Sequence, residues 1–341
     1  MNYRFTNDYS EIAHPEIMKA IRAAMNEQNA GYGVDAHSEN AEKLILKRFG
    51  IRDGKVFFLQ GGTQTNATVL SFLLKPYEAV LACDTGHINV HETGAVEGTG
   101  HKVYTCRPKD GKLSPEDIYN AVNHNRDEHM VKIRAVYISN ATETGTVYTA
   151  GELEAIRAAC DECGLYLFMD GARLGTALTS EGNDVTPEMI GRLCDVFYIG
   201  GTKNGMLFGE AVVFKSAKTA EEFRYHIKNR GAMAAKGFIA GIMFERAFSD
   251  GLYFEMAEKA NKTAAFIRKS IMDHVDFAGN STTNQIFVRL DKVRAQELIS
   301  RFGCELWSED ENATVVRIVT SFATEKEDCK ELIGFFSGFF R

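Results

Sequence analysis

A single lysine follows an apolar run in the stretch DVFYIGGTKNG, residues 195–205. The run is rich in β-branched and aromatic residues, which is typical of a buried strand. Two glycines come shortly before Lys203, and glycine lets backbone segments approach each other closely. An amine in such a poorly hydrated cleft loses its charge more readily and becomes nucleophilic toward carbonyl groups. Lys203 is therefore the first candidate for a covalent catalytic residue.

A second candidate site lies in FLQGGTQTN, where an apolar run ends, two glycines turn the chain and a helix is expected near Thr63. The free N–H groups and the positive end of a helix form a ready phosphate site. The stretch lacks the Gly-Lys-Ser/Thr ending of a P-loop and the spacing of a dinucleotide-binding loop. A tight turn with a threonine N-cap is the alternative interpretation of Gly62 and Thr63.

A carboxylate ends a third apolar run, in YLFMDGARLG. Asp170 is partly desolvated at that position and needs a cation or a donor. It can pair with Arg173, cap a helix, or hold a ring nitrogen in its protonated form. A phosphate turn, a strand-end Asp and a strand-end Lys are together the parts that pyridoxal 5′-phosphate needs. The lysine forms the Schiff base and the carboxylate pairs with the pyridinium nitrogen.

Short apolar runs alternate with helical patterns along most of the chain, which predicts an α/β fold with a mostly parallel central sheet flanked by helices. In such sheets ligands gather at the carboxyl ends of the strands. The link between the last two runs is too short for a parallel crossover, so that pair is antiparallel or distant in the sheet. The expected strands are residues 56–60, 79–84, 102–107, 133–140, 166–170, 196–200 and 211–215.

The pattern changes near residue 250, where a long helical stretch leads into three strand-like runs and a final helix. These features predict a smaller C-terminal α+β domain. We expect a large cofactor-binding domain at residues 1–249, which includes an N-terminal segment 1–15, and a small domain at 250–341.

The chain resembles the threonine aldolases, which are fold type I pyridoxal-phosphate enzymes. The matching stretches include FTNDYSEIAHPEI, AGYGVDAHSENAEK, GHINVHETGA, LYLFMDGARLGTAL, GGTKNG and VVRIVTSFAT, in order over nearly the whole chain. The resemblance implies that Lys203 forms the Schiff base, Asp170 pairs with the pyridinium and His87 stacks on the cofactor ring. It also implies that Gly62 and Thr63 hold the phosphate.

The resemblance assigns further residues to the substrate. Arg173 and Arg317 match arginines near the substrate carboxylate and the cofactor, and Asn7 occupies a position where the family often has serine. Tyr32 matches a tyrosine contributed by a neighbouring subunit, and Lys236 can reach the phosphate from that subunit. A structural salt bridge at Arg317, a structural role for Tyr32 and simple surface exposure of Lys236 remain the alternatives.

One position departs from the better-known bacterial branch, which has a second active-site histidine in a Thr-His-Asn-Gly string. The corresponding string here is TETG, residues 142–145, so Glu143 replaces that histidine. A carboxylate can hold a water molecule or accept a proton, and we therefore count Glu143 among the catalytic candidates.

The bulk composition excludes several classes of function. The net charge of −7 and the absence of a basic run argue against nucleic acid as a partner. No apolar run reaches membrane-spanning length, and no signal peptide is recognisable at the N-terminus. Seven scattered cysteines fit a reducing cytoplasm, and their spacing predicts no metal site.

The resemblance implies retro-aldol cleavage of threonine or allo-threonine to glycine and an aldehyde, in a homodimer or homotetramer with shared active sites. The alternative activities are β-elimination and cleavage of a bulkier β-hydroxy amino acid such as phenylserine.

Overall fold

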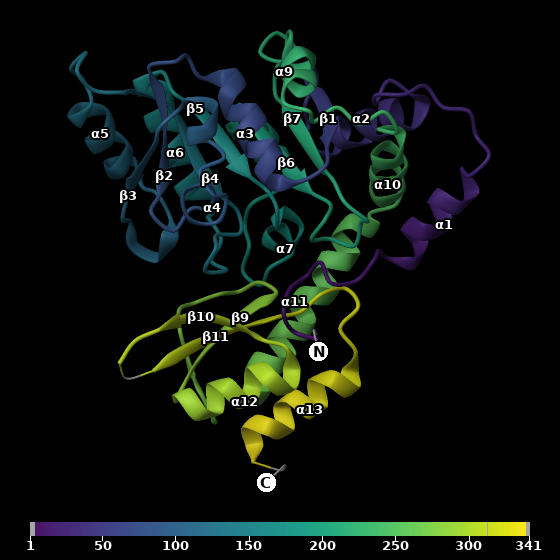
Figure 1. The fold of residues 1–341 in the computed structure, drawn as a ribbon, viewed down its shortest axis with the longest axis vertical. Coiled ribbons are helices and arrows are strands. Elements are labelled where there is room, and N and C mark those ends of the chain that lie inside the picture. Colours follow the sequence, from purple (N-terminus) through teal and green to yellow (C-terminus); the bar gives the residue numbers. More distant parts are fainter. Residues whose placement is uncertain (1–3, 312, 339–341) are drawn as a thin grey trace.

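The computed structural model describes residues 4–311 and 313–338. A seven-stranded sheet forms its centre. A four-stranded antiparallel sheet lies next to the carboxyl ends of the parallel strands of the large sheet (Figure 1). The large sheet has the order β1-β7-β6-β5-β4-β2-β3. Its strands are β1 (Lys55–Leu59), β2 (Glu78–Cys83), β3 (Val103–Cys106), β4 (Lys132–Ser139), β5 (Tyr166–Asp170), β6 (Val196–Gly200) and β7 (Glu210–Phe214).

The pairing confirms the expected mostly parallel sheet. Strands β3, β2, β4, β5 and β6 pair in parallel, whereas β7 runs antiparallel to both β6 and β1. The short link between β6 and β7 therefore closes an antiparallel pair, which was one of the two expected outcomes. Because β7 is reversed, its first residue lies at the edge where its parallel neighbours end.

Helices cover both faces of the large sheet, as a buried parallel sheet requires. One apolar cluster joins one strand face to α2, α6, α8 and α10, and a second joins the opposite face to α3 and α9. The helices of this part are α1 (Pro15–Ala23), α2 (Ala36–Arg48), α3 (Gly62–Leu73), α4 (His87–Val90), α5 (Pro115–His124), α6 (Ala150–Cys163), α7 (Leu174–Leu178), α8 (Pro187–Leu193), α9 (Phe223–Asn229) and α10 (Phe238–Ser249), with 3₁₀ turns at Glu97–Thr99 and Lys109–Gly111.

Local sequence explains where the helices begin. Ser114 before α5 and Thr149 before α6 each form a capping box with an acidic residue three positions later. Helix α3 differs, because its N-cap is Gly61 and no side chain caps it. The alternative interpretation, a threonine N-cap, is therefore wrong, and the N-terminal end of α3 keeps free N–H groups beside the cavity described below.

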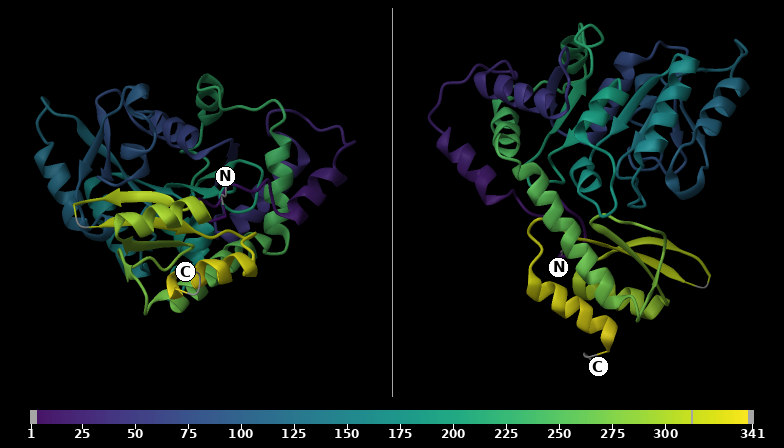
Figure 2. Two further views of the ribbon diagram at one scale, coloured as in Figure 1. Left: turned by 60° about the horizontal axis from the view of Figure 1, so that its bottom comes forward. Right: turned by 180° about the vertical axis from the view of Figure 1, so that it is seen from behind.

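Helix α11 (Leu252–Ile271) runs from the large sheet to the small one (Figure 2). Its N-terminal half packs into the core of the large sheet, and its C-terminal half packs into a third cluster with the small sheet. The remaining elements are β8 (Asp276–Phe277), β9 (Gln285–Leu290), α12 (Lys292–Phe302), β10 (Glu305–Glu309), β11 (Thr314–Val319) and α13 (Lys326–Ser337). The small sheet has the order β10-β11-β9-β8, so the expected C-terminal α+β unit is confirmed.

The N-terminal segment packs with the C-terminal unit. Phe5 is fully buried in the third cluster, and its backbone hydrogen-bonds to Phe302 and Val319. Residues 1–3 of the expected segment 1–15 lie outside the described residues, as do residues 312 and 339–341 of the small domain. A division at residues 249 and 250 remains a proposal, because α11 belongs to both cores.

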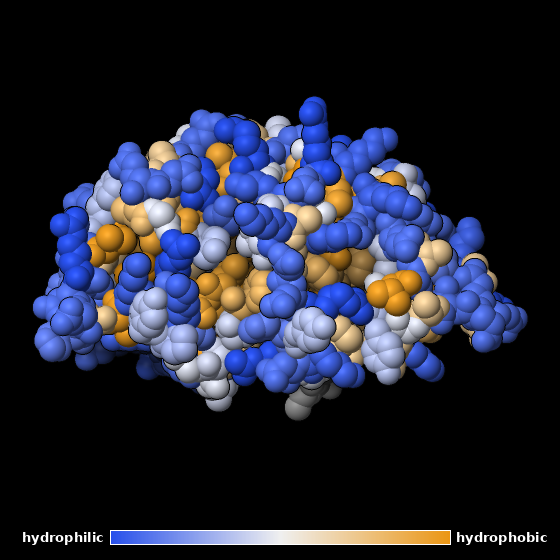
Figure 3. Space-filling view, turned by 90° about the horizontal axis from the view of Figure 1, so that it is seen from above, coloured by the Kyte–Doolittle hydropathy of each residue, from blue (hydrophilic) through white to orange (hydrophobic). Residues whose placement is uncertain are grey.

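Polar side chains cover most of the face opposite the small sheet, and apolar side chains are visible between them (Figure 3). In residues 4–311 and 313–338, none of the helices combines the length and apolar character that a bilayer crossing needs.

Candidate active site

A cavity of about 310 Å³ opens at the edge where the parallel strands of the large sheet end. The segments that follow β1, β2, β4, β5 and β6 all reach it, because parallel strands present their carboxyl ends at one edge. Its lining residues are Tyr9, Gln60, Gly61, Gly62, Thr63, His87, Ser139, Ala141, Thr142, Glu143, Asp170, Ala172, Arg173, Tyr198, Thr202, Lys203, Phe208 and Glu210.

Lys203 lies in a tight loop between β6 and β7. The amide of Gly201 donates to the Gly209 carbonyl at 2.9 Å, and that of Asn204 donates to the Gly201 carbonyl at 2.9 Å. A Cβ atom on Gly201 would lie 2.7 Å from the Gly209 carbonyl oxygen, so the loop requires glycine there. The close backbone approach expected from the sequence is therefore present and directs the lysine into the cavity.

The charge on Lys203 is disfavoured in this environment. Burial and the nearby Arg173 guanidinium lower the pKa of Lys203 below its ordinary value, although Asp8 and Asp170 oppose the shift. An amine with a lowered pKa is more often neutral and nucleophilic near neutral pH. The geometry fits the covalent role expected for this lysine.

Asp170 ends β5 in a set of donors rather than in an ion pair with Arg173. Its Oδ2 accepts from Tyr137 Oη at 2.5 Å and from Asn66 Nδ2 at 3.2 Å, and its Oδ1 accepts from the Ala172 amide at 3.0 Å. Burial alone would raise the pKa of Asp170, but His87 and hydrogen bonds from Tyr137 and Tyr198 lower it below the ordinary value. The carboxylate thus keeps its negative charge although it is buried.

His87 begins α4 and is linked to Asp170 through two buried side chains. Its Nδ1 lies 2.7 Å from Glu92 Oε1, and the same oxygen accepts from Asn66 Nδ2 at 2.7 Å. Asn66 also donates to Asp170, so this amide connects the two carboxylates. The chain of bonds fixes the orientation of the imidazole, which the stacking role expected for His87 requires.

Glu143 lies next to His87 in the segment after β4. One of its oxygens accepts from the His87 backbone N–H at 3.0 Å and from Ser139 Oγ at 2.7 Å. Burial raises the pKa of Glu143 above its ordinary value, and the Ser139 hydrogen bond only partly opposes this. A carboxyl whose pKa is raised keeps its proton to a higher pH than a solvent-exposed glutamate does, which suits a group that exchanges protons with a substrate.

The two arginines assigned to the substrate differ in how they are paired. Arg173 donates to both carboxylate oxygens of Asp8, at 2.7 Å from Nε and 3.0 Å from Nη2. The alternative of an Asp170–Arg173 pair is therefore wrong. Burial alone would raise the pKa of Asp8. The nearby cations Arg173 and Lys203 outweigh this effect and lower the pKa of Asp8 below its ordinary value.

Arg317 on β11 bonds to Gln285 Oε1 at 3.2 Å and forms an ion pair with Glu305, and its guanidinium lies 5.1 Å from the centre of the Trp307 ring. Its buried Nε has no hydrogen-bond partner. A salt bridge is thus present, as the structural alternative required, but one donor remains for a further acceptor.

Asn7 does not line the cavity. Its Oδ1 accepts from the Tyr9 amide and from Ser10 Oγ, each at 2.9 Å, and so closes a turn. The neighbouring Tyr9 reaches the cavity instead, with its ring centre 6.0 Å from Lys203 Nζ. The substrate contact expected for Asn7 remains a prediction.

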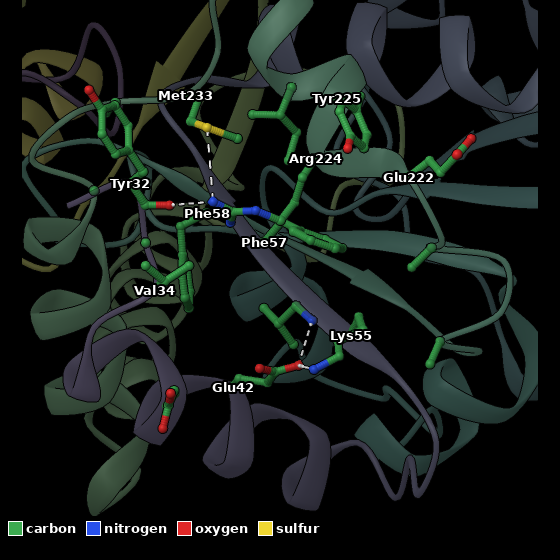
Figure 4. A pocket seen from close by; sticks show the side chains of 18 of the residues that line it. Tyr32, Val34, Glu42, Lys55, Phe57, Phe58, Glu222, Arg224, Tyr225 and Met233 are labelled. Carbon is green, nitrogen blue, oxygen red and sulfur yellow. Dashed lines mark hydrogen bonds and ion pairs between the residues drawn. The ribbon is translucent and has the colours of Figure 1, made fainter. Parts of the chain in front are cut away.

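Neither Tyr32 nor Lys236 lines the cavity at Lys203, and Tyr32 borders a separate hollow of about 510 Å³ (Figure 4). Tyr32 lines this hollow; its amide donates to the Ala235 carbonyl at 3.0 Å and its carbonyl accepts from Arg224 Nη2 at 3.2 Å. Lys236 is exposed in the next turn. A single chain therefore does not bring these two residues to the cavity, and their roles remain predictions.

Several polar residues in or next to the cavity were not predicted from the sequence. Asn66 and Glu92 lie inside helical or turn segments, and no local pattern distinguishes them. Glu210 carried a usable signal, because it is an acidic residue between a glycine and the apolar run AVVF. Asp8 gave no such signal, since its partner Arg173 is 165 residues away in the chain. Across the described part of the chain, no three His, Cys, Asp or Glu side chains gather as metal ligands.

Comparisons with known proteins agree with this architecture. Residues 8–293 match the family described as Beta-eliminating lyase. A low-specificity L-threonine aldolase from a Pseudomonas strain is 35% identical over 86% of this chain and 85% of its own length. A second, from Pseudomonas aeruginosa, is 33% identical over 87% and 86%.

Solved structures lead to the same family. A threonine aldolase from Leishmania major is 44% identical, with a TM-score of 0.96 over 99% of both chains. A putative L-allo-threonine aldolase from Listeria monocytogenes shares the fold at 17% identity, with a TM-score of 0.76. The chain therefore belongs to the threonine aldolases within the beta-eliminating lyase family.

Proposed function

We propose that the protein uses pyridoxal 5′-phosphate to cleave threonine and allo-threonine into glycine and acetaldehyde. The observation that carries this proposal is the meeting of Lys203, Asp170 and the uncapped start of α3 in one cavity. The relatives named as threonine aldolases support the same activity.

The residues of the cavity fit this cofactor. The free N–H groups at Gly62 and Thr63 suit a phosphate, because no side chain occupies the end of α3. Asp170 keeps a negative charge that can face a protonated ring nitrogen. Lys203 would hold the aldehyde carbon covalently, and Arg173 would lie beside the bound cofactor.

Pyridoxal 5′-phosphate, when bound, supplies a protonated ring that accepts the electron pair of a breaking bond. Asp170 maintains that protonation, since its carboxylate is fixed by Tyr137 and Asn66 and does not take up the proton itself. His87 would hold the ring of the cofactor, and Glu92 sets the orientation of the His87 imidazole.

Arg317 binds the substrate carboxylate in this proposal. Its unpartnered Nε offers a donor, whereas Arg173 already gives two bonds to Asp8. A planar guanidinium fixes the carboxylate in one orientation and thereby sets which bond at Cα can break. Asn7 would assist at the edge of the site, since it lies two residues before Tyr9, which lines the cavity.

Glu143 and His87 handle the proton of the β-hydroxyl group. Loss of that proton lets the hydroxyl oxygen become the carbonyl of acetaldehyde while the Cα–Cβ bond breaks. Glu143 accepts a hydrogen bond from the His87 backbone, so the two groups stand side by side and can hold a water molecule between them and the substrate. Return of a proton to Cα completes glycine.

We further propose an assembly of at least two chains in the cytoplasm, a homodimer or homotetramer, in which Tyr32 and Lys236 serve the site of a neighbour. The support is that neither residue lines the cavity of its own chain and that both side chains are exposed.

A panel of β-hydroxy amino acids tests the proposed reaction. Threonine and allo-threonine should release glycine and acetaldehyde in equal amounts, and phenylserine should release benzaldehyde if bulkier side chains are accepted. Release of ammonia and a keto acid without glycine would instead establish β-elimination and contradict the proposal.

A further inference from the structure

Glu210 is a buried carboxyl group at the floor of the cavity, with only 4% of its surface exposed. It is the first residue of β7, and its Cα pairs with Leu59 at the end of β1 and with Gly200 at the end of β6. The phosphate turn follows β1 and the lysine loop follows β6. Glu210 therefore lies between the strand end that leads into Gly62 and Thr63 and the strand end that leads into Lys203.

The side chain of Glu210 points to the face of the sheet that α3 covers. Side chains alternate along a strand, and Val212 and Phe214 belong to the cluster that includes α3. Tyr198 shares this face, and its Oη lies 3.1 Å from the position of a Cβ atom on Gly62. The Glu210 carboxyl therefore faces the same side as the open end of α3.

Among residues 4–311 and 313–338 no lysine, arginine or histidine forms an ion pair with this carboxyl, although Lys203 lies near enough to act on its pKa. Its Oε2 accepts from the Gly201 amide at 3.2 Å, and the Thr202 hydroxyl is a second hydrogen-bond partner. An ionised carboxylate and a phosphate dianion in one poorly hydrated cavity would repel each other strongly. A protonated carboxyl has an O–H donor and removes the repulsion.

We propose that Glu210 binds the phosphate of the cofactor as a neutral acid, by donating its O–H to a phosphate oxygen. The inference rests on the proposed function, because it takes the turn at Gly62 and Thr63 as the phosphate site. Glu210 is then a binding residue that couples cofactor affinity to pH.

Of the acidic groups around Glu210, Glu210 itself is the one expected to change its charge at mildly alkaline pH. Burial raises the pKa of Glu210 to about 8, and Thr202 and Lys203 only partly oppose this. Asp170 stays ionised because its pKa is lowered, and burial keeps Tyr198 and Tyr253 neutral by raising their pKa. Lys203 is the other group that can change charge, since its pKa is lowered.

The sign of the pH effect follows from linkage. The phosphate binds the protonated acid, so its affinity is highest below the pKa of free Glu210 and falls as pH rises above about 8. The loss approaches about tenfold per pH unit when protonation is obligatory. The phosphate itself remains a dianion in this range, because its second pKa is about 6.

Calorimetric titration of the full-length, cofactor-stripped protein with pyridoxine 5′-phosphate tests the proposal. This probe has an alcohol in place of the aldehyde, so it cannot bond covalently to Lys203. The Kd of the wild type should rise steeply above about pH 8. Glu210→Gln keeps an amide donor and an acceptor for Gly201, and its Kd should lose that part of the slope.

Glu78→Gln is the matched control. Glu78 is also a buried glutamate at the first position of its strand, but that strand is parallel, so Glu78 lies at the end of the strands away from the cavity. It should retain the wild-type slope. A flat wild-type Kd above pH 8, or an equal slope in Glu210→Gln, would overturn the inference while the phosphate site stands. A flat wild-type Kd overturns the inference even if the Glu210→Gln variant does not fold. Absence of any binding by the wild type would overturn the proposed function itself, and the inference with it.

Discussion

The cavity at Lys203 and the hollow at Tyr32 differ in how many of their side chains are buried and paired within one chain. In and next to the cavity, Asp8, Asp170 and Glu92 each have a buried partner from another element. Around the hollow, Tyr32, Val34 and Tyr225 leave about half or more of their surface exposed, at 48%, 54% and 76%. The first region is organised before any ligand or second chain arrives, whereas the second presents aromatic and apolar groups that a neighbouring chain would cover.

Asp170→Asn should give the largest kinetic effect, because it removes the charge of the cavity while keeping its shape. We expect kcat to fall by about two to three powers of ten, as for other losses of preorganised electrostatic stabilisation. Steady-state glycine release measures it. Asp84→Asn is the control, since Asp84 pairs with the exposed Arg107 outside the cavity. Near-normal turnover in Asp170→Asn would reduce the carboxylate to a structural role.

Glu143→Gln should lower kcat by about a hundredfold, near the lower end for loss of a general base. The pKa of Glu143 is raised by burial, so its ionised fraction falls as pH drops through that raised value. The wild-type rate should therefore decline on the acid side, and the variant should lack this decline. An unchanged acid limb in the variant would assign the proton transfer to His87 alone.

Arg317→Lys should lower kcat/KM by about one to two powers of ten, which corresponds to about 1.5–3 kcal/mol for a charge-assisted hydrogen bond. The fold should survive, because a cation still faces Glu305. Glu305→Gln is the matched control: its carboxylate is exposed, and an exposed ion pair contributes at most about 1 kcal/mol. If Glu305→Gln impaired kcat/KM as much as Arg317→Lys, the arginine would belong to the scaffold and Arg173 would become the anchor.

Tyr32→Phe should give the smallest effect, about two- to tenfold in kcat/KM, since it removes one hydroxyl hydrogen bond. Tyr225→Phe changes another tyrosine of the same hollow and should leave the kinetics unaltered. Light scattering on the active sample completes the test. A fully active monomer would contradict the shared site, because one chain keeps Tyr32 away from its own Lys203.

The sequence predicted most strands and the edge of the sheet at which the site lies. This succeeded because apolar runs, glycine turns and strand-end polar residues such as Asp170 and Lys203 are local signals. The partners of these residues were not predictable, since Asp8 meets Arg173 and Tyr137 meets Asp170 only through the tertiary fold. The polar residue at the start of β7 was visible in the sequence, but its burial depends on the pairing with β1 and β6.

The central claim is that the amine of Lys203 holds the cofactor, and reductive trapping tests it most directly. Borohydride should reduce the bond between the protein and pyridoxal 5′-phosphate, and mass spectrometry of a digest should find the added mass on the peptide that contains Lys203. Lys236 is the internal comparison, because it is a phosphate-binding candidate without a covalent role. We expect modification of Lys203 alone, and stoichiometric modification of Lys236 or any other lysine would show that Lys203 does not form the Schiff base.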